Sequence, residues 1–201
     1  MNKILDKIKA FFKANSEIIT PTAVLAIICV VVTLALSSTN LLTASRIEEL
    51  AVETQNKAMA KLIEADEYTL QAAVLADEEI EYNAAIKDGE TVGLIFVTEA
   101  NGYGGAVSVM TAVNMDGSVA AIEILDASNE TPGLGQNVTK ESFYTQFNGL
   151  KNDIAVIKGG TANAENNEIN AVTGATISSK AVTAAVNQAL DYAAEIIVKE
   201  D

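Results

Sequence analysis

The stretch Asn170-Ala171-Val172-Thr173-Gly174-Ala175-Thr176-Ile177-Ser178-Ser179-Lys180 joins a hydroxyl-rich turn to a helical pattern. Four hydroxyl side chains surround its small central step, namely Thr173, Thr176, Ser178 and Ser179. Behind the turn, apolar residues recur at helical spacing on one face: Val182, Val186, Ala189, Leu190, Ala193 and Ile197. The stretch therefore predicts a turn followed by an amphipathic helix that packs against a core.

This turn is also a candidate anion site. Gly174 allows close approach of a ligand to the backbone, and Ser178 or Ser179 is a suitable N-cap for the helix. A helix start presents unpaired N–H groups and the positive end of the helix dipole, which favour a phosphate. Thr176 would place a hydroxyl just ahead of that phosphate site. The alternative is a polar turn that only caps the helix, because a hydroxyl-Gly-Ala-hydroxyl pattern alone is a weak signal.

Composition excludes several kinds of chemistry. The 201 residues include no His, no Trp and one Cys, Cys29. A Ser-His-Asp or Cys-His catalytic group is impossible, and one Cys cannot supply a Cys-rich zinc or iron–sulfur site. Carboxylates show no metal-ligand spacing, so we predict neither catalytic residues nor a metal site. Redox chemistry would need an organic cofactor, and the net charge of −14 argues against a nucleic-acid partner.

The N-terminal region has the pattern of a membrane anchor. Residues 1–17 carry Lys3, Lys7, Lys9 and Lys13, which predicts a basic cytoplasmic segment at a membrane surface. No charged residue occurs from Ile18 to Ser45, and residues 18–42 are predicted to form a transmembrane helix. Lysines before this run and glutamates after it place the N-terminus in the cytoplasm and the C-terminal domain outside. A cleavable signal peptide is the alternative, but the uncharged run is long for one.

Residues 43–78 are predicted to form a helical stalk. Ser45-Arg46-Ile47-Glu48 matches a capping box that would open a helix running to about Glu64. The stalk would lift the following domain off the membrane or pack beneath it. An acidic, solvated stalk without a partner is an equally good interpretation.

The period then changes to that of strands. Segments near 79–87, 91–100, 104–115 and 118–127 are separated by Asp88-Gly89, Asn101-Gly102 and Asp116-Gly117, which are hairpin signals. A short helix near 140–147 and a strand near 154–158 follow. We predict an α+β fold, an antiparallel sheet with flanking helices, as a domain over residues 79–201 on one N-terminal transmembrane helix.

Two glycine-rich stretches lie between these elements, Gly102-Tyr103-Gly104-Gly105 and Asn129-Glu130-Thr131-Pro132-Gly133-Leu134-Gly135. Taken alone, both are ordinary turn chemistry. Lys158-Gly159-Gly160 is interpreted as a strand-ending turn in preference to a phosphate contact.

Together with Thr173–Ser178, the two stretches resemble the covalent FMN-binding domains, whose signature is (Ser/Thr)-Gly-Ala-Thr-x-(Ser/Thr). These domains occur in Rnf complexes, as the G component, and in sodium-pumping NADH:quinone reductases, as the C component. Three motifs in the same order make the resemblance specific, and it covers about Ile80 to the C-terminus. Asn170 stands where the family usually has Asp, and Ser128 where it often has His.

The resemblance implies one cofactor, FMN, esterified through its phosphate to Thr176 by a flavin transferase. It also implies that the Thr-Pro-Gly-Leu loop lies against the isoalloxazine and that Tyr103 stacks on the ring. The further implied cofactor-binding residues are Thr173, Gly174, Ala175, Ser178, Thr131, Gly133 and Leu134. Glu130 is expected to order its loop and not to transfer a proton.

The implied function is electron relay by a membrane-anchored flavoprotein inside a ferredoxin:NAD oxidoreductase that translocates Na⁺ or H⁺. Its partners would be the other membrane and peripheral subunits of an Rnf-type complex in the cell membrane. The short chain favours the Rnf protein over the alternative, the C-type component of a sodium-pumping NADH:quinone reductase. Two other classes stay open, a non-redox tethered ligand-binding module and a scaffold whose motif is unmodified.

Overall fold

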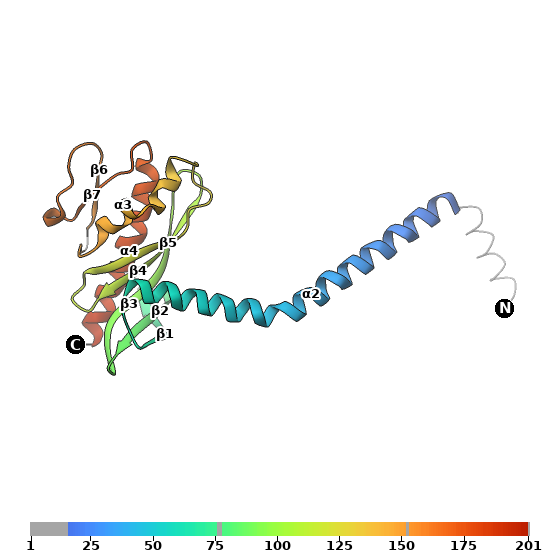
Figure 1. The fold of residues 1–201 in the computed structure, drawn as a ribbon, viewed down its shortest axis with the longest axis horizontal. Helices are drawn as coiled ribbons and strands as arrows, with labels where there is room; N and C mark the ends of the chain where they lie inside the picture. Colours follow the sequence, from blue (N-terminus) through green and yellow to red (C-terminus); the bar gives the residue numbers. More distant parts are fainter. Residues whose placement is uncertain (1–15, 76–77, 152, 201) are drawn as a thin grey trace. The chain divides into compact units, whose positions relative to one another are not determined.

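The computed structural model describes residues 16–75, 78–151 and 153–200 (Figure 1). The chain divides into two compact units, Met1–Glu53 and Thr54–Asp201. The predicted basic segment 1–17 lies outside the described residues except for its last two positions. The second unit contains all the described strands and the candidate site.

The first described element is a helix, α2 (Ser16–Leu62). It runs without a break through Ser45, so the predicted helix start at the capping box is wrong. The reason lies in the sequence, because no Gly or Pro interrupts the chain between Pro21 and Leu62. Within the described part of the chain, no helix combines the length and the apolarity needed to cross a membrane. The side chains of residues 18–20, 23 and 40–42 of the predicted span lie outside the described set.

Five antiparallel strands form a meander in the order β1-β2-β3-β4-β5. They are β1 (Glu67–Leu75), β2 (Glu78–Lys87), β3 (Glu90–Asn101), β4 (Ala106–Asn114) and β5 (Val119–Asp126). The predicted α+β class and antiparallel sheet are confirmed, and the four predicted strands correspond to β2–β5. Strand β1 falls where a helical stalk over 43–78 was predicted, and that part of the prediction is wrong. As an edge strand with mostly exposed side chains, β1 has little of the apolar alternation by which strands are identified.

The turns between strands follow their sequence signals to different degrees. Asp88 and Gly89 have φ angles of 54° and 83° and join Lys87 to its partner Glu90, as a two-residue type I′ turn requires. Asn101-Gly102 instead opens a four-residue loop, closed by the Gly102 N–H donating to the Gly105 carbonyl at 2.7 Å. That longer loop carries Tyr103.

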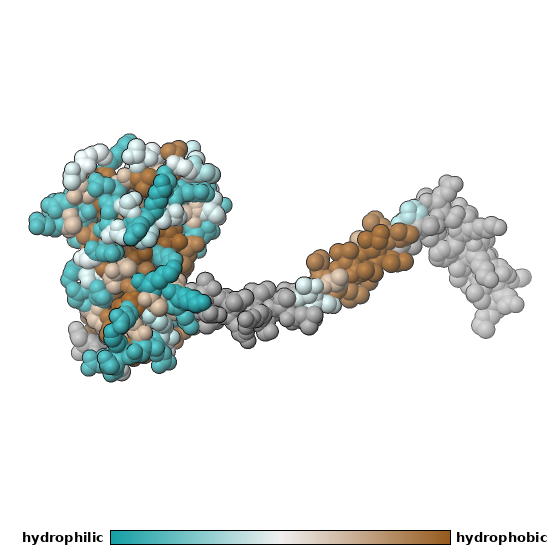
Figure 2. Space-filling view, viewed as in Figure 1, coloured by the Kyte–Doolittle hydropathy of each residue, from teal (hydrophilic) through white to brown (hydrophobic). Residues whose placement is uncertain are grey.

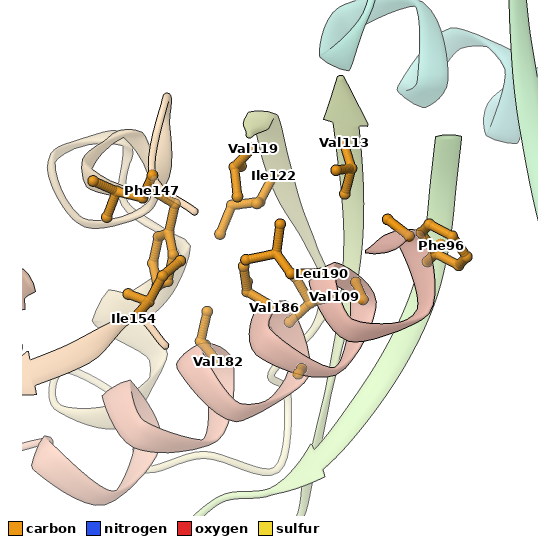
Figure 3. Packing of buried hydrophobic residues seen from close by; sticks show 14 of the residues in the cluster. Phe96, Val109, Val113, Val119, Ile122, Phe147, Ile154, Val182, Val186 and Leu190 are labelled. Atoms are coloured by element: carbon orange, nitrogen blue, oxygen red, sulfur yellow. The ribbon is translucent and has the colours of Figure 1, made fainter. Parts of the chain in front are cut away.

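The sheet is covered on both faces. Helix α4 (Thr176–Glu200) packs on one face with Phe96, Val109 and Val113 (Figure 3). The predicted apolar face of this helix is buried at Val182, Val186, Ala189, Leu190 and Ala193, and half-buried at Ile197. The last turns of α2 cover the other face, where Met59 and Leu62 meet Ile95 and Met110. Burial of α4 fixes where its N-terminus lies, and the candidate site is built there.

Short elements complete the domain around the start of α4. The predicted helix near 140–147 appears as η1 (Gly135–Thr139), α3 (Glu141–Tyr144) and η2 (Thr145–Phe147). The predicted strand near 154–158 is β6 (Ala155–Ile157), which pairs in parallel with β7 (Glu168–Asn170). A further turn, η3 (Ala164–Asn166), lies between them. Helix α4 contacts both η1 and β6.

Replacing each of two buried threonines under α4 with valine is expected to change the stability of the domain in opposite directions. Thr98 Oγ1 donates to the Ala185 carbonyl at 2.8 Å, whereas Thr111 Oγ1 has no hydrogen-bond partner among the described residues. We expect Thr111→Val to raise the free energy of unfolding by about 1 kcal/mol, because a near-isosteric methyl removes an unsatisfied hydroxyl. Thr98→Val should lower it by about 1 kcal/mol. Urea unfolding followed by circular dichroism measures both, and a destabilised Thr111→Val variant would contradict the expectation.

Candidate functional site

The turn before α4 is held by hydrogen bonds within the Val172–Ser179 stretch. Gly174 has a φ of 78°, and the Ala175 N–H donates to the Val172 carbonyl at 2.9 Å. Ser179 Oγ accepts from the Val172 N–H at 3.0 Å and donates to the Ala175 carbonyl at 2.9 Å. The helix begins at Thr176, so the prediction that Ser178 or Ser179 is its N-cap is wrong. Both serines are buried inside the first turn because their hydroxyls tie the turn and a neighbouring loop together.

Glu130 is the centre of the site although its side chain is only 1% exposed. Its Oε2 accepts from Ser178 Oγ at 2.5 Å, and its Oε1 accepts from the Gly104 N–H at 3.0 Å. One carboxylate therefore joins the first turn of α4, the β3–β4 loop and its own loop after β5. This arrangement supports the predicted loop-ordering role of Glu130.

The glycines of the two loops make room for this carboxylate. A Cβ atom added at Gly102 would overlap Glu130 Oε1, and one at Gly135 would overlap Oε2. At Gly104 the added atom would overlap the backbone carbonyl of Asn129. Neither loop is therefore an ordinary flexible turn, because its glycines are required by close packing.

A pocket of about 510 Å³ opens beside these loops. Seven of the nine predicted cofactor-binding residues line it: Tyr103, Thr131, Leu134, Gly174, Ala175, Thr176 and Ser178. Thr173 instead lines a neighbouring pocket of about 420 Å³ with Asn137 and Lys140. Gly133, whose φ is 76°, lies outside the described lining of both pockets, and its carbonyl accepts from Asn137 Nδ2 at 2.7 Å.

Four lining residues were not among the predicted cofactor-binding residues, namely Glu130, Gly135, Lys158 and Ile177. Lys158 is the one basic residue among the described side chains that line this pocket. Gly159 and Gly160 have φ angles of 74° and 119°, so the predicted turn is present and also brings Lys158 to the pocket. The Lys-Gly-Gly pattern was the available signal for it.

The pocket has the donors that an anion requires. The N–H groups of Thr176, Ile177 and Ser178 belong to the first helical turn, where no intrahelical acceptor exists. The N-terminal end of α4, which is the positive end of its dipole, and Lys158 line the same pocket. Thr176, a half-buried residue, lines the pocket together with these groups. A phosphate ester on its hydroxyl would therefore meet donors and positive charge.

Two positions at which the sequence departs from the family pattern have local roles. The Asn170 N–H donates to Gln146 Oε1 at 2.8 Å, and Asn170 Oδ1 accepts from the Ala162 N–H at 3.1 Å. Ser128 is exposed, and its N–H donates to Asp126 Oδ1 at 2.8 Å, which holds the pKa of Asp126 below its usual range. Ser128 lies outside the described pocket lining. The part of the chain that the structure describes holds no cluster of three metal-ligating side chains.

Comparison with known proteins defines the class. Residues 102–191 match the FMN-binding domain family, so the matched segment contains both glycine-rich loops and the start of α4. The solved C component of a Na(+)-translocating NADH-quinone reductase from Parabacteroides distasonis shares the fold, with a TM-score of 0.51 and 24% identity. That match covers 59% of this chain and 63% of the solved one.

Two relatives of known complexes identify the family to which the chain belongs. The G component of the proton-translocating ferredoxin:NAD(+) oxidoreductase complex of Clostridium ljungdahlii is 34% identical over 180 residues, 89% of this chain and 93% of that protein. The Na(+)-translocating counterpart of Acetobacterium woodii is 35% identical over 183 residues, 83% of this chain and 87% of that protein. The chain belongs to the family of Rnf complex G proteins.

Proposed function

We propose that this protein carries FMN esterified through its phosphate to Thr176 and relays electrons inside an Rnf-type complex. The observation that carries the proposal is the position of Thr176 at the start of α4, in the lining of the pocket that Lys158 also lines. Family membership supplies the cofactor and the setting. The remaining subunits and a flavin transferase are its proposed partners.

Different residues of the pocket would bind different parts of FMN. The N–H groups of the first turn of α4 and the Lys158 ammonium would hold the phosphate. Leu134 and Tyr103 offer apolar surface for a ring, since their side chains are 46% and 72% exposed. When bound, FMN supplies electron-transfer chemistry that protein side chains lack. Glu130 keeps the two loops in place around it.

The intact mass of the purified protein tests this proposal directly. Protein matured beside a flavin transferase should be heavier than its sequence by one FMN joined with loss of water. Protein made without the transferase should have the unmodified mass. An unmodified mass under both conditions would favour a scaffold role. Yellow colour lost on denaturation would favour a non-covalent ligand-binding module.

We further propose that residues 18–42 anchor the protein in the cell membrane. From Val24 to Leu36, the described Val, Leu and Ile side chains of α2 are at least 49% exposed and form a continuous apolar section (Figure 2). No charged residue occurs from Ile18 to Ser45, so exposure to lipid would be favourable. The domain would lie on the outer side of the membrane, because lysines precede this run and glutamates follow it.

The orientation gives a prediction for intact cells. Protease added outside should digest the C-terminal domain and spare the N-terminal segment 1–17. Immunoblots with one tag at each end measure the outcome, and lysed cells serve as the control for cleavage at both ends. A domain that resists digestion until the cells are lysed would reverse the proposed orientation.

Leu134 gives a prediction about the flavin ring. We expect Leu134→Ala to leave FMN attached but to increase its fluorescence and shift its reduction potential, because the ester is independent of the loop. Leu125→Ala is the matched control, since Leu125 is 44% exposed on β5 and lies outside the described pocket lining. Redox titration and fluorescence of both variants measure the difference. An unchanged potential in Leu134→Ala would place the ring elsewhere.

A further inference from the structure

Strands β2 and β3 separate along half of their length. Their paired residues run from Lys87↔Glu90 to Asn83↔Ile95 and then stop, although β2 begins at Glu78 and β3 continues to Asn101. Beyond this point β2 pairs only with β1, and β3 only with β4, among the described strands. The sheet therefore contains two facing strand edges with no ladder between them.

A cleft of about 700 Å³ lies at this separation. Its lining contains both strand edges, over Glu79–Asn83 and Ile95–Glu99, and side chains of α4. In an antiparallel sheet, alternate residues direct N–H and C=O groups to each side of a strand. The unpaired lengths of β2 and β3 thus present backbone donors and acceptors to the cleft from both sides.

The two faces of the sheet present different kinds of side chain to the cleft. Glu79, Glu81 and Glu99 are exposed carboxylates, and the described lining contains no basic residue. In a strand, residues two apart share a face, so Glu79 and Glu81 lie on the face that carries the exposed Val97. The opposite face presents the partly buried Ile80 and Tyr192 on the α4 side, whereas Phe96 is buried beneath the stacked ring of Tyr82.

We propose that this cleft binds an extended segment of a partner protein in which basic residues alternate with apolar residues. The segment adds a strand between β2 and β3, so its backbone completes both ladders. Its basic side chains meet the three glutamates, and its apolar side chains face Ile80 and Tyr192. In a strand, alternate side chains point to opposite faces. A segment that alternates basic and apolar residues can therefore meet the glutamates on one face and the apolar side chains on the other. This inference does not depend on covalent FMN, so each of the two proposals can be tested without the other.

The test uses the full-length protein in detergent and a fluorescent synthetic octapeptide of alternating lysine and valine. We expect saturable binding by fluorescence anisotropy, with slower hydrogen exchange of the backbone amides between Phe96 and Asn101. A peptide of the same composition with lysines and valines in two blocks should bind at least about tenfold more weakly, because it cannot send each type to one face.

Charge reversal provides the matched variants. Glu79→Lys with Glu81→Lys should weaken binding of the alternating peptide by about tenfold or more, since two attractive contacts become repulsive. Glu141→Lys with Glu165→Lys makes the same change in net charge at exposed positions outside the described lining of the cleft and should leave binding within about twofold. Flavin content should be equal in all variants.

Four results would overturn the proposal. If both charge-reversed variants lost peptide binding equally, net charge alone would explain the binding. The same conclusion would follow if the block peptide bound as tightly as the alternating peptide. Protection of amides away from β2 and β3 would move the binding site. A concentration-dependent dimer without peptide, lost on Glu79→Lys with Glu81→Lys, would identify a second copy of this chain as the occupant.

Discussion

Thr176→Ala is expected to abolish covalent flavin completely while the domain still folds. The hydroxyl is half-buried at the first residue of α4, and its loss removes the proposed acceptor without removing a core contact. The free energy of unfolding should change by less than about 0.5 kcal/mol. Flavin fluorescence of the denatured band in a gel, together with the intact mass, measures the attachment.

Two variants act as controls for this result. Thr176→Ser keeps a hydroxyl at the same backbone position and should retain part of the flavin. Thr173→Ala removes an exposed hydroxyl on the neighbouring pocket and should retain all of it. Fluorescence that survives in Thr176→Ala and disappears in Thr173→Ala would move the acceptor to Thr173.

Glu130→Ala is expected to cause the largest loss of stability among single changes at the site. It leaves the Gly104 N–H and the Ser178 hydroxyl without their acceptor and opens a void where the glycines had made room. An unsatisfied buried group costs about 1–3 kcal/mol, so we expect the free energy of unfolding to fall by about 3 kcal/mol. Urea unfolding of the unmodified protein measures this without any contribution from FMN.

Glu130→Gln separates shape from charge. Its amide oxygen still accepts from the Gly104 N–H, and its NH₂ group donates to Ser178 Oγ, so most of the stability should return. Glu165→Ala, at an exposed glutamate, should have little effect. An unfolding free energy unchanged in Glu130→Ala would show that the carboxylate does not hold the loops.

Local signals in the sequence predicted the elements that depend on local structure. The Asp88-Gly89 turn needs positive φ angles, and the apolar spacing of α4 fixes its buried face whatever it packs against. Strand β1 was missed because its place depends on pairing with β2, and its own residues are mostly exposed. The helix start was misplaced because a serine pattern typical of caps also serves hydrogen bonds inside the first turn.

The sequence predicted the separate motifs of the candidate site. It did not predict that the carboxylate of Glu130 joins them. Glu130 was predicted only to order its own loop, and only the fold brings its carboxylate to Ser178, forty-eight positions away. Lys158 resembles the start of a turn in the sequence, although it lines the pocket. Contacts between distant segments have no local period or dipeptide signature, so sequence patterns alone do not reveal them.

The Glu130 junction also bears on the timing of maturation. Protein groups alone join the loops and the first turn of α4, so the proposed acceptor turn needs no cofactor to hold its shape. A modifying enzyme would therefore meet a finished surface and not a nascent, extended peptide. Under the proposed ester at Thr176, flavin attachment would follow folding, and a pool of folded but colourless protein could wait for it.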